Sequence, residues 1–256
     1  MMLPTPHGLL AIELAITLAL LLWADRWLHR HLQGLMLLLT GDEELALWLY
    51  AIVLFPGVVL HELSHALMAR LVGTRIGRIH VLPRRVGKRI QLGYVPVEST
   101  DFLRASFIGI APFLVGSCAI VAIGYLVFGT PEVLQALAQG DWSGGAQAVA
   151  SMTLTPDGWL WAYLVFAISN TMLPSRSDLH AWPALLMVIA IAILVTVWAG
   201  GAELIREGSG RFLSMASRWI VLFGASALLI DLPFFTLILV SHKALEQLKG
   251  VRLTYD

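Results

Sequence analysis

The chain has little charge and almost no cysteine, and each shortage excludes a class of protein. Charged residues make up 13% of its 256 residues, whereas soluble domains carry about 25%. Cys118 is the only cysteine, so disulfide scaffolds and cysteine-rich metal sites are excluded. Lys plus Arg and Asp plus Glu each number 17, and this balance predicts no nucleic-acid partner.

Apolar residues are what the chain has in excess. They make up 58% of the sequence, and the mean hydropathy is +0.78. This composition predicts an all-α polytopic membrane protein, in which each crossing needs about 20 apolar residues. About six transmembrane helices are therefore expected, at residues 8–28, 45–72, 103–128, 158–173, 182–200 and 213–241.

The charge between these spans predicts their orientation. The segment 73–104 is strongly basic, and the segment 129–157 contains acidic residues but no Lys or Arg. Because basic loops stay on the cytoplasmic side, we expect 73–104 inside, 129–157 outside and both termini in the cytoplasm. The expected location is the inner membrane of a bacterial cell, in which the chain is an integral protein.

Two stretches within the basic segment are prone to form strands. They are Arg78–Leu82 and Arg89–Val95, with Pro83 and Gly87 between them. Together they predict a small membrane-associated β-hairpin between the second and third spans. An exposed strand edge can pair with an extended peptide, and a basic hairpin can equally hold anionic lipid. Both interpretations stay open.

The second span contains His61-Glu62-Leu63-Ser64-His65, which is an HExxH motif. On a helix, His61 and His65 lie one turn apart on the same face. Two imidazoles in this arrangement can hold one Zn²⁺, and Glu62 can act as a general base beside it. Ionisable side chains within a membrane each cost about 3 kcal/mol on insertion scales. The motif therefore predicts a functional site with one zinc ion per chain.

A catalytic zinc takes three protein ligands, so a third residue is needed. Asp178 follows the fourth span and, in the predicted orientation, emerges on the side of the membrane where the histidines lie. Glu13 and Asp231 lie within spans, and an intramembrane carboxylate more often pairs with another helix than binds metal. His80 and His180 are interpreted as interfacial side chains. The rival ligands are carboxylates within or next to a span, namely Asp231, Glu13, Glu98 and Asp101.

The order of motifs resembles the site-2 protease family of intramembrane zinc metalloproteases. HELSH in a span is followed by a basic hairpin, by Gly109-Ile110-Ala111-Pro112 in the next span, and by an Asn-x7-Asp interval from Asn170 to Asp178. The resemblance covers roughly residues 50–180 and is to the compact branch without a PDZ or CBS domain. The chain departs from the family where Ser177-Asp178-Leu179 replaces Leu-Asp-Gly.

The resemblance implies a role for each of these residues. His61, His65 and Asp178 are expected to bind zinc, Glu62 to act as the general base, and Asn170 to hydrogen-bond the substrate backbone or the developing oxyanion. We divide the chain into a first span with its connecting segment (1–44), a three-span catalytic core (45–181), and two further spans with a cytoplasmic tail (182–256).

The expected function is regulated intramembrane proteolysis by a zinc endopeptidase. Its partners would be membrane lipid and single-span membrane proteins or peptides, which it would cleave within or beside the membrane. The alternative is a non-catalytic zinc-binding membrane scaffold or a transporter-like protein. Glu62 argues against this alternative, because a histidine pair that only holds metal does not need a carboxylate beside its first member.

Overall fold

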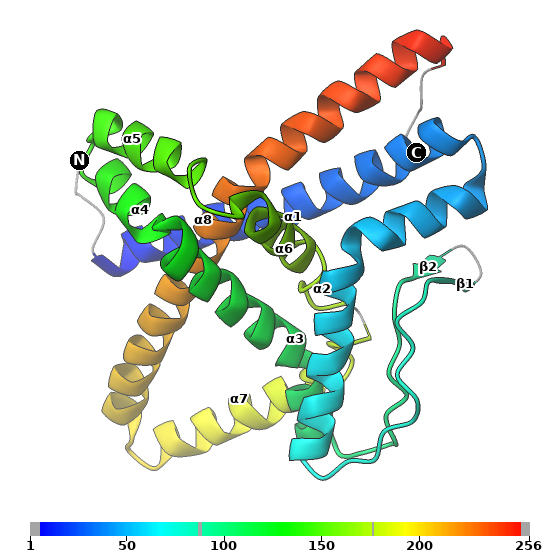
Figure 1. Cartoon of the computed structure of the whole chain (residues 1–256). Helices are drawn as coiled ribbons and strands as arrows, with labels where there is room; N and C mark the ends of the chain where they lie inside the picture. The colour runs from blue at the N-terminus through cyan, green and yellow to red at the C-terminus, as the bar shows by residue number, and fades with distance from the viewer. Residues whose placement is uncertain (1–5, 87–88, 176, 252–256) are drawn as a thin grey trace.

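The computed structural model describes residues 6–86, 89–175 and 177–251, and most of their regular structure is helical (Figure 1). One π-helical turn, Gly124–Phe128, continues the helix Phe102–Ile123 up to Gly129. The elements in chain order are α1 (Pro6–Thr40), α2 (Glu43–Leu71), β1 (Arg84–Val86), β2 (Arg89–Gln91), α3 (Phe102–Ile123), η1 (Gly124–Phe128), α4 (Thr130–Ala138), α5 (Trp142–Met152), α6 (Gly158–Ser169), α7 (Trp182–Trp198) and α8 (Ala202–Lys249).

Three helices in the described part of the chain are long and apolar enough to cross a membrane. They are α2, α8, and α3 together with η1. The length and composition of these helices indicate a membrane protein. They do not support six spans, because α6 and α7 are apolar but shorter. The predicted first span, 8–28, is only part of α1, which continues past residue 28 through Arg30 to Thr40. Charged residues such as Arg sustain a helix as well as apolar ones do, so an apolar window does not mark the helix ends.

The predicted external loop 129–157 also differs from the structure, because it contains α4 and α5. Gly129 adopts a left-handed conformation (φ 60°) that ends η1, and Pro131 lies in the first turn of α4. Asp141 caps α5 by accepting a hydrogen bond from the backbone N–H of Gly144 at 2.9 Å. These are ordinary helix-start signals.

The segment between α2 and α3 forms two arms that run side by side. β1 pairs antiparallel with β2, and isolated bridges join His80 to Tyr94 and Ile76 to Val97. β2 lies within the predicted strand 89–95, whereas β1 follows the predicted strand 78–82 instead of coinciding with it. The turn at residues 87–88 lies outside the described residues.

α2 carries the HExxH motif and has clear start and stop signals. The Asp42 carboxylate accepts from the backbone N–H groups of Glu44 and Leu45, which satisfies donors that the first turn leaves free. The helix ends at Leu71, and Gly73 follows with φ 74°. His61 and His65 therefore lie together on α2, in the helical stretch after Pro56, as the motif requires.

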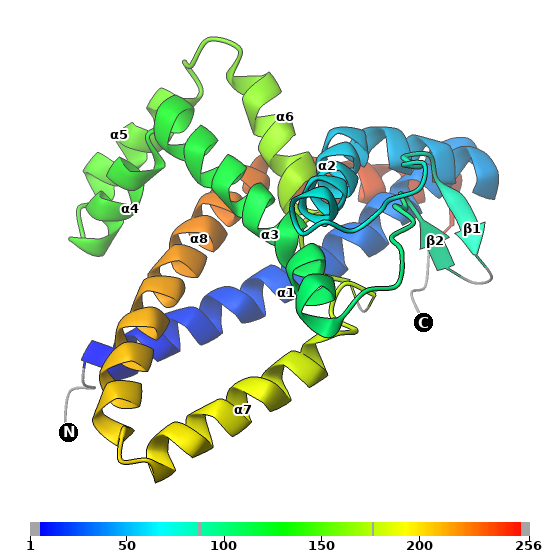
Figure 2. The ribbon, with the colours of Figure 1, turned by 90° about the horizontal axis from the view of Figure 1, so that it is seen from below.

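α6 lies at the centre of the packing, because both apolar clusters found among the described residues include it. One cluster joins Phe166 of α6 to α1, α2 and α8, and the other joins Val165 of α6 to α3 and α8. α7, in contrast, has no buried residue and runs along the edge of the bundle, where it contacts α3 and α8 (Figure 2). The C-terminal end of α6 is thereby held firmly between α2, α3 and α8.

Candidate metal centre

The structure brings His61, His65 and Asp178 together, with ligand atoms that all lie within 4.8 Å of one another. Nε2 of His65 is 3.1 Å from Nε2 of His61 and 3.3 Å from Oδ1 of Asp178. Nε2 of His61 is 3.9 Å from Oδ2 of Asp178. Ligands of a tetrahedral zinc at about 2.0–2.1 Å lie about 3.3 Å from one another. The spacing therefore fits a single metal ion.

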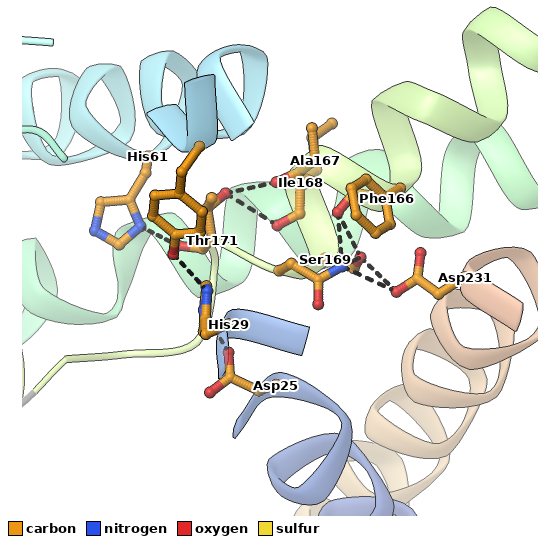
Figure 3. Close-up of polar contacts among 11 residues, drawn as sticks. Asp25, His29, His61, Phe166, Ala167, Ile168, Ser169, Thr171 and Asp231 are labelled. Atoms are coloured by element: carbon orange, nitrogen blue, oxygen red, sulfur yellow. Dashed lines mark hydrogen bonds and ion pairs between the residues drawn. The ribbon is translucent and has the colours of Figure 1, made fainter. Parts of the chain in front are cut away.

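A hydrogen bond to a backbone carbonyl fixes the orientation of each histidine ring. Nδ1 of His61 is 2.7 Å from the carbonyl oxygen of Thr171 (Figure 3), and Nδ1 of His65 is 2.8 Å from that of Ile108. A carbonyl oxygen can only accept, so Nδ1 of each ring must carry the proton. In a neutral ring this leaves the lone pair on Nε2, which is the arrangement found in metal-ligating histidines.

These tautomers give the cluster its chemical character. Both Nε2 atoms and the Asp178 carboxylate are then acceptors, and all three point at one another across the distances given above. Lone pairs at this separation repel unless a cation lies between them. Either a proton or a metal ion can supply the charge, and the donor set of two imidazoles and one carboxylate is one that metals such as zinc accept.

Asp178 is held in place by the segment between α6 and α7. The backbone N–H of Ser175 donates to Oδ2 of Asp178 at 2.7 Å, and the backbone N–H of Asp178 donates to the Ser175 hydroxyl at 3.3 Å. Burial acts to raise the pKa of the Asp178 carboxyl, but a hydrogen bond from His65, in the form whose Nε2 also carries a proton, and those from Ser175 outweigh it and place the pKa below its ordinary value. The hydrogen bonds from Ser175 thus favour the ionised form of Asp178.

Glu62 lies beside the three candidate ligands and is buried, with 7% of its surface exposed. Gly93, on the second arm of the hairpin, packs against the Glu62 side chain. A Cβ at position 93 would lie within 3 Å of three Glu62 atoms, including Oε1. Only glycine lets the hairpin backbone approach so closely, so the hairpin helps to enclose the carboxylate next to the metal centre.

Two further glycines let the segments that carry the centre approach one another. A Cβ on Gly57 of α2 would overlap the carbonyl oxygen of Ala167 and the hydroxyl of Thr171 at the end of α6. A Cβ on Gly109 of α3 would overlap the backbone carbonyl oxygen of Asp178. The helices thus pack backbone to backbone here, as small residues allow in membrane proteins.

Asn170 and Asp231 belong to a separate polar cluster. Oδ2 of Asp231, in α8, accepts from the Ser169 hydroxyl at 2.8 Å and from the Asn170 amide at 3.2 Å. Figure 3 shows Asp231 beyond Ser169, on the other side of the α6 end from His61. Asp231 therefore pairs with another helix instead of joining the histidines. The role of Asn170 toward a substrate stays a prediction.

The other candidate residues also lie apart from the cluster of ligands. Glu13 and Glu98 are exposed, and exposed Asp101 caps α3 by accepting from the N–H groups of Leu103 and Arg104. His80 forms a backbone bridge with Tyr94, and Nδ1 of exposed His180 contacts the Ser177 carbonyl. Within the described residues, only one group of three or more metal-ligating side chains is close enough to share an ion.

Sequence reasoning missed the two carbonyl groups that orient the histidines. The carbonyl of Thr171 lies just past the end of α6, where helix carbonyls lack an intrahelical donor. The carbonyl of Ile108 lies four residues before Pro112, which has no N–H to donate to it. A proline within an apolar span was the signal that could have indicated the second carbonyl.

Comparison of the chain with models of protein families, with curated proteins and with solved structures finds no match. The assignment of this centre therefore depends on its own geometry and chemistry.

Proposed function

We propose that the protein is an intramembrane zinc endopeptidase, as its resemblance to the site-2 protease family implies. The observation that carries this proposal is the convergence of Nε2 of His61, Nε2 of His65 and the Asp178 carboxylate, with the Glu62 carboxylate next to them. Two imidazoles and one carboxylate, with a fourth position left open, form the ligand set of catalytic zinc in proteases. One zinc ion per chain is proposed.

Each residue then has a task that its position supports. A zinc ion in this centre would act as a Lewis acid toward a peptide carbonyl and would make water more acidic. Glu62 accepts a proton from the attacking water and passes it to the leaving amine. The carbonyl oxygens of Thr171 and Ile108 keep both imidazoles in the ligating tautomer. Ser175 keeps the Asp178 carboxylate directed toward His65.

The proposed substrates are single-span membrane proteins or peptides cut within or beside the membrane. A transmembrane helix has its backbone groups bonded internally, so it must unwind locally before a peptide bond is accessible. The arm of the hairpin that contains Gly93 borders Glu62, where an extended strand would have to pass. We place the protein in a bacterial inner membrane with the basic hairpin on the cytoplasmic side.

The test compares Glu62→Gln with the wild-type protein. Both are purified for zinc analysis and co-expressed with candidate single-span proteins. Because the amide has almost the same shape as the carboxylate but cannot take up the proton, we expect one zinc per chain and a loss of cleavage of about 10²–10⁴-fold. The matched control is Glu98→Gln, which removes an exposed carboxylate from the adjacent segment and should cleave normally.

The results separate the proposal from the alternative scaffold. Cleavage by Glu62→Gln at the wild-type rate would overturn the proposed general base. Stoichiometric zinc in a wild-type protein that cleaves none of the candidates would instead favour the non-catalytic zinc-binding protein. A purified wild-type protein that takes up no zinc would remove the metal centre altogether.

A further inference from the structure

Pro112 lies inside α3, where a proline leaves one backbone carbonyl without its helical donor. In an α-helix the N–H of residue 112 would bond to the carbonyl oxygen of residue 108, but proline has no N–H. The Ile108 carbonyl oxygen lies 2.8 Å from Nδ1 of His65. The acceptor that turns the His65 ring is thus the one that Pro112 leaves free.

Both partners of this contact are buried, so the Ile108 carbonyl needs a hydrogen-bond donor from within the protein. Ile108 is 6% exposed, His65 is 9% exposed, and Pro112 is fully buried. A carbonyl left without a donor at such a place is unfavourable, because no water replaces the missing partner. Pro112 removes the helical donor from the Ile108 carbonyl, and His65 of α2 supplies a donor in its place.

The same turn of α3 also accommodates a second ligand. Gly109 follows Ile108 directly, and its missing side chain admits the backbone carbonyl of Asp178. The stretch from Ile108 to Pro112 therefore contacts His65 through a carbonyl group and Asp178 through a glycine surface. One turn of α3 thus contacts two of the three candidate ligands, His65 and Asp178, although α3 itself contributes no ligand.

We infer that Pro112 is a positioning residue for the metal centre, because it frees the Ile108 carbonyl to orient His65 with Nε2 toward the ion. This inference rests on the proposed zinc centre. An N–H at position 112 would compete with Nδ1 of His65 for the same oxygen. A carbonyl oxygen can accept two donors, so this N–H would weaken, and not remove, the bond that fixes the tautomer and the direction of the His65 ring.

The experiment restores that N–H and then removes it again without the proline ring. The first variant is Pro112→Ala in the full-length protein. The second carries the same alanine side chain, but the linkage between residues 111 and 112 is an ester, which has no N–H. The control is Pro233→Ala, which makes the same change inside α8. Each protein is stripped of metal and titrated with Zn²⁺ against a chelating dye, and the absorption spectrum of its Co²⁺ form is recorded.

Removing the hydrogen-bond partner of a metal-ligating histidine typically lowers the metal affinity about 10–100-fold. Because Pro112→Ala weakens this partner without removing it, we expect the variant to bind Zn²⁺ about 10-fold more weakly than the wild type, at the lower end of that range, and to show a shifted Co²⁺ spectrum. The ester variant should recover the affinity and the spectrum, and Pro233→Ala should leave both unchanged. The recovery distinguishes the N–H from the shape of the proline ring.

Two results would overturn the inference while leaving the zinc centre intact. One is wild-type affinity in Pro112→Ala. The other is an equal loss in the alanine and ester variants, which would show that the ring shape matters and the freed carbonyl does not. If the wild type binds zinc and the variants behave as expected but no substrate is cleaved, the proposed protease function fails and the role of Pro112 stands.

Discussion

Two buried polar clusters flank the C-terminal end of α6, and they solve the problem of polarity in an apolar bundle in opposite ways. At Asp231, the hydroxyl of Ser169 and the amide of Asn170 donate to a carboxylate oxygen. At the metal centre, two imidazole nitrogens and the Asp178 carboxylate face one another as acceptors. The first cluster is mostly satisfied within the protein, whereas the second places three acceptors where a cation could bind them.

Three consecutive residues serve the two clusters. Ser169 and Asn170 bond to Asp231, and the carbonyl of Thr171, the next residue, bonds to His61. The end of α6 is thus a shared support that joins α8 on one side to α2 on the other. The difference teaches that burial of ionisable groups does not identify a metal centre, and that the balance of donors and acceptors does.

The largest expected difference between the clusters concerns metal content. His65→Ala removes one of three converging ligands, and a zinc ion left with two protein ligands is held weakly. We expect near-total loss of zinc from purified His65→Ala, measured by elemental analysis. The matched change in the other cluster, Asp231→Asn, should retain one zinc per chain. Full zinc occupancy in His65→Ala would show that the ion binds elsewhere.

A substitution at Gly57 should damage the metal centre and the packing of the bundle together. Gly57→Ala places a methyl group against the Ala167 carbonyl and the Thr171 hydroxyl, so the α6 end must move away from α2 and from His61. Overpacking of this kind typically costs about 1–3 kcal/mol. We expect both a lower free energy of unfolding in detergent and weaker zinc binding.

The control for this prediction is Gly208→Ala in α8, where a Cβ meets no atom within 4 Å. Alanine is favoured over glycine inside a helix by about 0.5–1 kcal/mol, so this variant should be neutral or slightly more stable, with unchanged zinc affinity. Normal stability and zinc affinity in Gly57→Ala would contradict the close approach of α6 to α2.

Part of the metal centre was predictable from the sequence because it depends on local geometry. The spacing of His61 and His65 places both rings on one helix face wherever the helix lies. Asp178 was selected from several carboxylates by the order of the spans and by a family pattern. The carbonyls of Thr171 and Ile108 were not predicted, because every residue has a carbonyl and only the packing of α2 against α3 and α6 shows which ones are free.

The fold was predictable in class but not in its helix ends. An apolar window identifies a stretch that prefers lipid, but it does not say where the backbone stops being helical. α1 and α8 extend well beyond the predicted spans 8–28 and 213–241, while α6 ends at Ser169, before the predicted end at residue 173. Side-chain polarity and helix propensity are separate properties, so they give different boundaries.

The smallest expected effect concerns the cluster at Asp231, which should matter for stability and not for metal. Asp231→Ala removes the shared acceptor of Ser169 and Asn170. Both donors also bond to the Phe166 carbonyl oxygen, at 3.1 and 2.8 Å, so neither is left without a partner. We therefore expect a loss of about 1–2 kcal/mol in the free energy of unfolding in detergent, toward the lower end of the cost of an orphaned buried group.

Asp231→Asn sharpens this last prediction, because it keeps one oxygen as an acceptor and replaces the other by an amide. Oδ1 of Asp231 has no hydrogen-bond partner among the described residues, so the amide loses no existing contact and the variant should lose less free energy of unfolding than Asp231→Ala. Zinc affinity should be unchanged in both variants, since Asp231 reaches the metal centre only through the α6 end. Loss of zinc from Asp231→Asn would show that the two clusters are coupled, and the contrast between a closed network and an open metal centre would no longer hold.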